Sequence, residues 1–190
     1  FDPLGELPAF DRIMLSVDCT FTDNSDADYV VGAVMAQAGV DIYILDLYRK
    51  KVPIGGIISM ILGMYDKYNL DGTIIELAAN GFAAYQMLQK KIPGLIGYKP
   101  HGKSKIGKVT AAIPTIQAGN VHLPKYAPWL DAFINEFSLF PVAKNDDICD
   151  AVSMGINYMN TRVAPAITPV HWGRASHLLE EAPVLAVLVS

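Results

Sequence analysis

Two apolar segments of this 190-residue chain each end in an acidic residue, and this pattern limits the folds that the chain can adopt. Asp18 ends the segment RIMLSVD, and Glu76 ends the segment GTIIE. Short apolar runs of this kind are typical of strands buried in a sheet. A carboxylate is rarely left at the end of such a strand for structural reasons alone, because burying an unpaired charge is costly. Both residues are therefore candidates for a functional site at a sheet edge.

A third acidic group lies at the start of a predicted helix, in the segment KNDDICDAV, which contains Asp146, Asp147 and Asp150. At 100° per residue, Asp147 lies on the flank of the apolar face of this helix, whereas Asp146 and Asp150 lie roughly 160° from it. Asp147 is therefore best placed to face the sheet edge. The alternatives are that Asp146 only caps the helix, and that Asp150 is solvated or supports a metal ligand without touching the metal.

Asp18 and Glu76 also have purely structural interpretations. Asp18 precedes the loop-like segment FTDNSDAD and would then only begin a turn, and Glu76 would face solvent. Ile74 and Ile75 argue against the second interpretation, because successive strand residues point to opposite faces and both faces then look buried. Several carboxylates brought together form a hard, oxygen-rich site for Mg²⁺ or Mn²⁺. Such a site suits phosphodiester hydrolysis.

The order of the predicted elements favours an α/β fold with a mixed five-stranded sheet. A three-strand meander comes first, followed by βα units, so that helices cover both faces of the sheet. The predicted strands are RIMLSVDCT, DYVVGAVMAQ, VDIYILDLYRK, GTIIEL and GLIGYKP, and the predicted helices are 53–69, 81–91, 105–117, 128–140 and 146–160. If the first and fourth strands are parallel neighbours, Asp18 and Glu76 emerge at the same edge of the sheet.

Hydrophobic residues make up 52% of the chain, which indicates a globular protein. The net charge of −4 does not by itself indicate a nucleic-acid-binding protein. Any contact with DNA must then depend on a local basic stretch. We expect Lys99, Lys103, Lys105 and Lys108 to contact the phosphate backbone. The alternative is that these lysines form an ordinary solvated surface.

Two other features have simple interpretations. Residues 97–104, GYKPHGKS, match the phosphate-loop pattern, but Pro100 removes a backbone donor from a loop that would need it. We therefore expect a flexible basic loop, with nucleotide binding as the alternative. Cys19 and Cys149 are expected to be small buried residues with free thiols. The apolar end PVLAVLVS is too short to span a bilayer, so no membrane association is expected.

Three stretches resemble, in order, the C-terminal nuclease domain of the large terminase subunit, the DNA-packaging motor of tailed bacteriophages. They are IIELAANG, AGNVHLPKYAPWLDAFINEFSLFP and KNDDICDAVSM. The resemblance implies a ribonuclease-H-like fold and a metal-dependent endonuclease that cuts concatemeric double-stranded DNA into genome lengths. From the same acids we expect hydrolysis with two Mg²⁺ or Mn²⁺ ions. Asp18 would bridge them and Glu76 and Asp147 would hold one each, with Asp146 as the alternative to Asp147.

The resemblance also implies an organisation and a set of partners. Residues 1–10 would be a linker from a missing upstream ATPase domain, 11–162 the nuclease domain, and 163–190 a C-terminal tail. The expected partners are double-stranded DNA, the ATPase domain, the portal protein and the small terminase subunit, in the host cytoplasm. The alternatives are another ribonuclease-H-like nuclease (a junction resolvase, transposase or exonuclease) and a catalytically inactive module that docks on DNA or on a portal.

Overall fold

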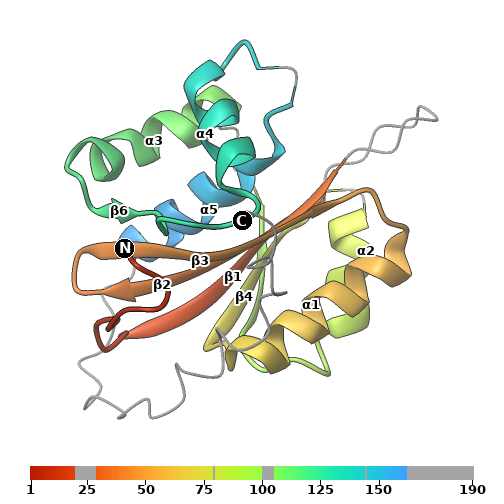
Figure 1. Cartoon of the computed structure of the whole chain (residues 1–190). Coiled ribbons are helices and arrows are strands. Elements are labelled where there is room, and N and C mark those ends of the chain that lie inside the picture. The colour runs from red at the N-terminus through yellow and green to blue at the C-terminus, as the bar shows by residue number, and fades with distance from the viewer. Residues whose placement is uncertain (20–28, 79, 100–104, 144, 162–190) are drawn as a thin grey trace, which may run out of the picture.

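A mixed sheet forms the middle layer of the protein, and helices cover both of its faces (Figure 1). The computed structural model describes residues 1–19, 29–78, 80–99, 105–143 and 145–161. The predicted tail therefore lies outside the described residues, as does most of the loop that matches the phosphate-loop pattern. None of the described helices has the length and apolar character needed to cross a bilayer.

The first three strands form the predicted antiparallel meander. They are β1 (Arg12–Asp18), β2 (Val30–Ala38) and β3 (Asp41–Lys50). β1 pairs with β2 along its whole length, and β2 continues through a tight turn into β3. Because β1 and β3 run in the same direction, their C-terminal ends lie at the same edge of the sheet.

The remaining strands extend the sheet on both sides of the meander. β4 (Gly72–Glu76) pairs in parallel with β1, β5 (Leu95–Tyr98) in parallel with β4, and β6 (Val121–His122) in parallel with β3. The strand order is β5-β4-β1-β2-β3-β6. The sheet therefore has six strands in the described part of the chain and not the predicted five. β6 could not be predicted as a strand, because two residues are too few to show a period-two pattern.

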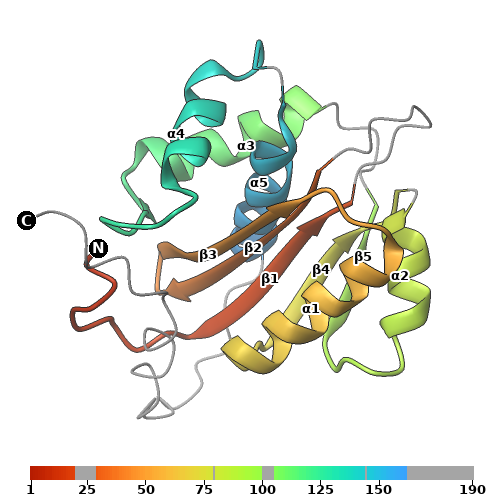
Figure 2. The same ribbon diagram turned by 45° about the vertical axis from the view of Figure 1, so that its right-hand side comes forward.

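Two helices cover one face of the sheet and three cover the other (Figures 1 and 2). The first pair is α1 (Ile54–Tyr68) and α2 (Asn80–Leu88), and the second group is α3 (Lys105–Gln117), α4 (Leu130–Leu139) and α5 (Asp147–Thr161). Each face has its own hydrophobic core, one beneath α1 and α2 and the other beneath α4 and α5. The predicted helices on both faces of the sheet are thus confirmed.

α5 lies directly on the sheet and is buried on nearly all sides. A Cβ atom at Gly155 would overlap the sulfur of Met35 and lie 3.1 Å from Cβ of Ser16, so only glycine permits this close approach. The hydroxyl of Ser16 donates a hydrogen bond of 2.6 Å to the carbonyl of Ala151 on α5. This packing fixes the N-terminal turn of α5 above the C-terminal edge of β1.

The first ten residues, predicted as a linker, lie along the β3–β6 side of the sheet. The backbone nitrogen of Phe1 donates to the carbonyl of Leu123 at 2.7 Å, and the N–H of Lys125 donates to the carbonyl of Phe1 at 2.7 Å. The rings of Phe1 and Phe10 pack against Tyr43 at centroid distances of 5.5 Å and 5.4 Å. This segment therefore contributes aromatic contacts to the edge of the domain.

Candidate active site

Asp18 and Glu76 end neighbouring parallel strands. The register pairs Val17 with Ile75, so Asp18 and Glu76 lie one residue further along β1 and β4. Val17 and Ile75 belong to the core beneath α1 and α2, and the alternation of strand side chains turns the two acids toward the opposite face. The exposed fractions are only 1% for Asp18 and 7% for Glu76. The predicted parallel pairing, with both acids at one sheet edge, is confirmed.

The position of Glu76 also depends on the start of α2. A Cβ atom at Gly81 would overlap the backbone oxygen of Glu76, so the first turn of α2 can lie against the end of β4 only with glycine at this position. The N–H of Leu77 donates to the carbonyl of Tyr98 at 2.7 Å, which extends the β4–β5 pairing past Glu76. The backbone that carries this carboxylate is thus held from both sides.

The side chain of Lys108 lies between Glu76 and Asp150. Its Nζ is 3.1 Å from Oε2 of Glu76 and 3.2 Å from Oδ1 of Asp150, so that α3, α5 and β4 meet in one ion-pair cluster. Lys108 is 3% exposed and Asp150 1%. Burial by itself lowers the pKa of Lys108, but the carboxylates of Asp150 and Glu76 outweigh that effect and raise the pKa above its ordinary value. The ammonium group therefore stays charged at neutral pH.

These positions correct one expectation and exclude one of the two alternatives for Asp150. Lys108 does not face solvent, so its predicted contact with DNA phosphate is wrong in this structure. Asp150 is buried and not solvated. The helical angles indicated a single buried face of α5, but the sheet and the neighbouring helices together enclose nearly the whole helix. Asp150 instead holds Lys108 against Glu76.

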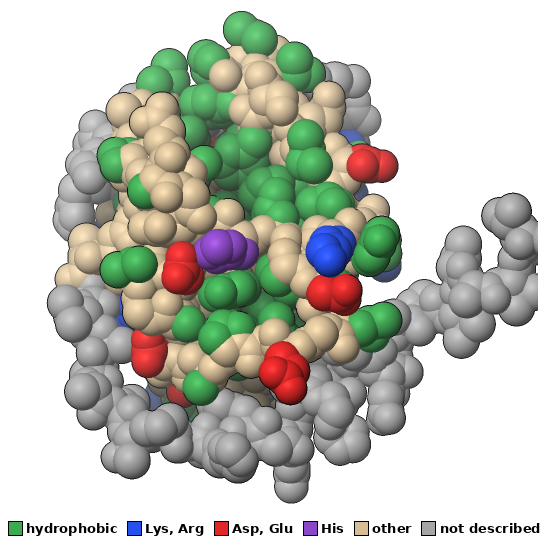
Figure 3. All heavy atoms as spheres, turned by 60° about the vertical axis from the view of Figure 1, so that its left-hand side comes forward, with side chains coloured by type: hydrophobic (Ala, Val, Ile, Leu, Met, Phe, Trp, Pro, Cys, Tyr) green, Lys and Arg blue, Asp and Glu red, His purple; other side chains and the backbone are tan. Residues whose placement is uncertain are grey.

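Of the other three lysines predicted to contact DNA, the structure describes the side chain of one. Lys99 is exposed, directly after β5. Lys103 and the side chain of Lys105 lie outside the described residues, although Lys105 is the first residue of α3. The described side chains on the β6 side of the molecule are more often hydrophobic or acidic than basic (Figure 3). A basic track would therefore have to lie elsewhere on the surface.

β2 and β3 continue the same edge of the sheet beyond Asp18. Asp18 pairs with Val31 on β2, and Val31 pairs with Arg49 on β3. Paired residues share a face, and Val31 belongs to the core beneath α5, so Arg49 lies on the same face as Asp18. One row of side chains thus crosses four strands, from Glu76 through Asp18 and Val31 to Arg49.

Arg49 forms a second ion-pair cluster at the far end of this row. Its Nη2 is 3.4 Å from Oε2 of Glu136 on α4 and 3.8 Å from Oδ2 of Asp147. The guanidinium group also lies over the ring of Tyr29, 4.3 Å from its centroid. Asp147, with an exposed fraction of 8%, is therefore held on the Arg49 side of the row, whereas Asp150 lies on the Lys108 side.

Glu136 joins this cluster to the start of α5. Its Oε1 accepts hydrogen bonds from the backbone N–H groups of Ile148 at 2.6 Å and Cys149 at 3.0 Å, two groups that have no partner within the helix. Burial raises the pKa of Glu136, and the hydrogen bonds and the charge of Arg49 only partly offset the effect. Asp146 precedes the helix and is half-buried, and its carbonyl accepts the N–H of Asp150 at 2.9 Å.

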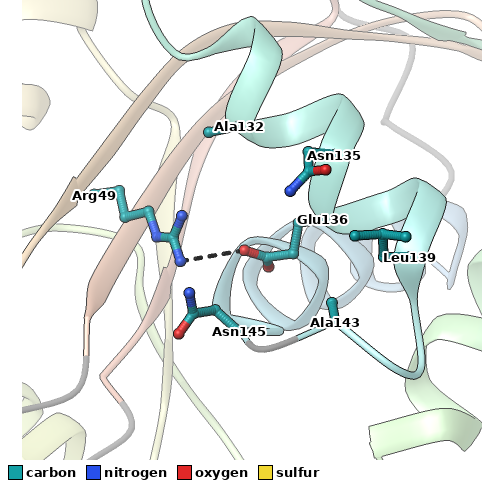
Figure 4. A pocket seen from close by; sticks show the side chains of 7 residues that line it. All are labelled: Arg49, Ala132, Asn135, Glu136, Leu139, Ala143 and Asn145. Atoms are coloured by element: carbon teal, nitrogen blue, oxygen red, sulfur yellow. Dashed lines mark ion pairs between the residues drawn. The ribbon is translucent and has the colours of Figure 1, made fainter.

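A small pocket of about 190 Å³ opens beside this second cluster. In Figure 4 the guanidinium of Arg49 points across it toward Glu136. Its lining residues are Arg49, Ala132, Asn135, Glu136, Leu139, Ala143 and Asn145. No role was predicted from the sequence for Arg49 or Glu136. The available signals were a basic residue at the end of a strand and an acid in a stretch that carries the family resemblance.

The donor chemistry of the site fits a hard divalent cation, since Asp18, Glu76 and Asp147 provide only carboxylate oxygens. The binding of the Lys108 ammonium by Glu76 and Asp150 shows that these carboxylates hold a cation. Within the described residues, however, no three Asp, Glu, His or Cys side chains are gathered closely enough to share one metal ion as they lie. Glu76 and Asp150 are turned instead toward Lys108, and Asp147 toward Arg49.

Both cysteines lie beside these acids and are buried free thiols, as predicted. Burial is the main cause that raises the pKa of Cys19 well above its ordinary value, and the charges of Asp18 and Glu76 raise it further. Burial likewise raises the pKa of Cys149, followed by the charges of nearby acids. Neither thiol is ionised at neutral pH, which excludes thiolate nucleophiles at these positions.

The mixed sheet, with acids at the ends of β1 and β4 and at the start of the last described helix, has the architecture of the ribonuclease-H-like class. The family model described as Terminase RNaseH-like domain matches residues 15–159, and the chain belongs to this family. No curated protein matches the chain.

Solved structures show the same fold at low sequence identity. The large terminase of the thermophilic bacteriophage D6E is 13% identical, with a TM-score of 0.63, and the match covers 84% of this chain and 42% of that one. The chain therefore spans less than half the length of that protein.

Two isolated nuclease domains give similar matches. The human cytomegalovirus terminase nuclease domain is 19% identical, with a TM-score of 0.58 over 83% of this chain and 88% of that one. The same domain, soaked in manganese and with an inhibitor bound, is 16% identical with a TM-score of 0.52, over 80% and 84%. The large terminase nuclease of the thermophilic phage G20c with bound zinc is 15% identical, with a TM-score of 0.59 over 77% and 80%.

Proposed function

We propose that this chain is the endonuclease domain of a viral DNA-packaging terminase and that it cuts concatemeric double-stranded DNA into genome lengths. The family match carries the proposal, because residues 15–159 include the ends of β1 and β4 and the start of α5. These are the three places where the buried acids lie. The same residues would act in the host cytoplasm during packaging.

We propose Asp18, Glu76 and Asp147 as the residues that would hold Mg²⁺ or Mn²⁺, with Asp146 as the alternative to Asp147. Zinc in the phage G20c nuclease and manganese in the cytomegalovirus domain support the use of divalent ions. Asp18 would hold metal at the centre of the site, because its strand lies between the two ion-pair clusters. Bound ions would lower the pKa of a water molecule and neutralise charge on the scissile phosphate.

The chain's own residues prepare this site in three ways. The pairing of β1 with β4 fixes the backbone positions of Asp18 and Glu76 side by side at one edge of the sheet. Glu136 fixes the first turn of α5 and with it Asp147. Arg49 compensates the charge of Asp147 and Glu136, which allows these acids to stay close together in a buried place.

Contact with DNA would come from lysines outside this buried cluster. Lys99 is exposed beyond β5, and Lys103 and Lys105 follow it in the sequence. Backbone contacts of this kind bind duplex DNA without reading its sequence. In the full protein the domain would work with an ATPase domain, a portal protein and a small terminase subunit.

The test is nicking and linearisation of supercoiled plasmid by the purified chain with Mn²⁺. We expect Asp18→Asn to abolish cleavage while far-UV circular dichroism shows a retained fold. Asp66→Asn is the matched control, since it makes the same change at an exposed position on α1, and it should cut as fast as the wild type. Full activity of Asp18→Asn would remove Asp18 from the mechanism.

Two further results would favour the alternatives. DNA binding that needs no divalent ion, with no cleavage by the wild type, would identify a docking module. Cleavage that strongly prefers four-way junctions or free ends over long duplex would indicate another ribonuclease-H-like nuclease.

A further inference from the structure

The ammonium group of Lys108 is bound by two of the acids at the candidate active site. It contacts both carboxylate oxygens of Glu76, at 3.1 Å and 3.3 Å, and one oxygen of Asp150 at 3.2 Å. All three side chains are less than a tenth exposed. A cation chelated by one carboxylate and bound by a second is the arrangement that carboxylates give to a divalent ion.

Lys108 is held in this position by its helix as well as by the acids. The side-chain amide of Asn157 on α5 donates a hydrogen bond of 2.8 Å to the backbone carbonyl of Lys108. α3 therefore lies against α5 at this residue, and the side chain reaches from there to the end of β4. The contact is thus part of how α3, α5 and the sheet pack together.

A second divalent ion beside Glu76 would lie next to this ammonium. Like charges a few ångströms apart repel strongly in a buried place, where screening by water and salt is weak. Glu76 could coordinate such an ion fully only after Lys108 had moved away from it. Lys108 lies on the Glu76 and Asp150 side. The protein cation on the Asp147 side is Arg49, whose Nη2 lies 3.8 Å from Oδ2 of Asp147, a single and longer contact than the 3.1 Å and 3.2 Å contacts of Lys108, so a metal ion displaces it more readily.

We propose that the ammonium group of Lys108 occupies the position of a second metal ion beside Glu76. The site then binds one divalent ion tightly and a second ion only when Lys108 moves away. The inference rests on the proposed nuclease function, and it names what controls metal loading at that same site. Lys108 is in this sense a positioning residue, because it acts through Glu76 and Asp150.

The experiment is calorimetric titration of the full 190-residue chain with Mn²⁺ alone, which does not depend on cleavage. We expect one tight ion in the wild type. Lys108→Met keeps the apolar stem of the side chain and removes the charge, and we expect it to bind two ions, the second at least about tenfold more tightly than in the wild type. Lys108→Arg keeps the charge and should resemble the wild type.

Lys67→Met is the matched control, because Lys67 pairs with Asp46 on the α1 side of the sheet, away from the site, and is largely exposed. It should leave Mn²⁺ binding unchanged. Wild-type protein with two equivalents of Mn²⁺ gives a check that needs no variant. We expect the electron paramagnetic resonance spectrum of an isolated bound ion and of free Mn²⁺, without the signal of a coupled pair.

A coupled pair in the wild type, or weaker Mn²⁺ binding by Lys108→Met than by the wild type, would overturn the inference. If the wild type cuts DNA and binds two ions with similar affinity, only the assignment of Lys108 fails. If it neither binds Mn²⁺ nor cuts DNA, the proposed function fails as well.

Discussion

Oε1 of Glu136 lies 2.6 Å from the backbone nitrogen of Ile148 and accepts its hydrogen bond, so that α4 supplies the N-terminal cap of α5. The same oxygen accepts the N–H of Cys149 at 3.0 Å. Sequence-local caps come from the residue that precedes a helix, whereas this cap comes from a separate helix. The position of Asp147 therefore depends on how α4 packs against α5.

Replacement of Glu136 by alanine should destabilise the domain by about 1–3 kcal/mol, because two buried N–H groups would be left without an acceptor. Glu136→Gln keeps an acceptor oxygen and should be clearly less destabilised. Urea unfolding followed by circular dichroism measures both values. Equal destabilisation of the two variants would show that the negative charge, and not the hydrogen bonds, is what matters at this position.

The backbone arrangement of Asp18 and Glu76 could be predicted from sequence because the information is local. Each acid ends its own apolar run, and the order of strands and helices favours parallel neighbours. The bounds of α3 were predicted at residues 105–117 for the same reason, and the structure has Lys105–Gln117. Patterns within one element thus located the elements of the site.

The partners of these acids could not be predicted in the same way. The helical angles of α5 indicated one buried face, but the sheet, α3 and α4 together bury Asp150 as well as Asp147. The role of Lys108 depends on where α3 lies over the sheet, and nothing within residues 105–117 encodes that position. Contacts between elements that are distant in the sequence decide which carboxylate faces which cation.

Tyr68 gives a test of pH dependence away from the active site. Its hydroxyl donates a hydrogen bond to Asp46, and burial first, then the charge of Asp46, raises the pKa of Tyr68 above its ordinary value near 10. Above pH 10 the phenol ionises in the unfolded chain but not in the folded one. This contribution to stability is therefore present below about pH 10 and is lost as pH rises further.

Tyr68→Phe should lower the free energy of unfolding by about 1.5 kcal/mol at pH 7, since the variant cannot donate a hydrogen bond to the carboxylate. The difference between wild type and variant should shrink as pH rises from about 9 to about 11, as measured by urea unfolding at each pH. Lysines also titrate in this range, but they do so in both proteins. A difference that stays constant would mean that the pKa of Tyr68 is not raised.

If the lysines after β5 contact DNA phosphates, they contribute to the salt dependence of DNA binding. Replacing Lys99, Lys103 and Lys105 together by glutamine should weaken binding to all duplex sequences alike. The slope of log affinity against log salt should become shallower by about 0.9 for each phosphate that the variant no longer neutralises. Fluorescence anisotropy with labelled duplex DNA in Ca²⁺, at several salt concentrations, measures the slope. An unchanged slope would return these lysines to an ordinary solvated surface.

Asp150→Asn should mainly lower stability, whereas Asp147→Asn should mainly abolish cleavage, because the two acids face different cations. Asp150 lies 3.2 Å from the buried Lys108, so its replacement should cost about 3 kcal/mol of stability. Asp147 is also buried, but its contact with Arg49 is longer, at 3.8 Å, so its replacement should cost less stability than that of Asp150. Plasmid cleavage with Mn²⁺, measured beside urea unfolding, should nevertheless be abolished in Asp147→Asn. If Asp147→Asn cuts normally, the metal ligand at the start of α5 is Asp146 or Asp150. Cleavage assays on Asp146→Asn would then distinguish these two residues.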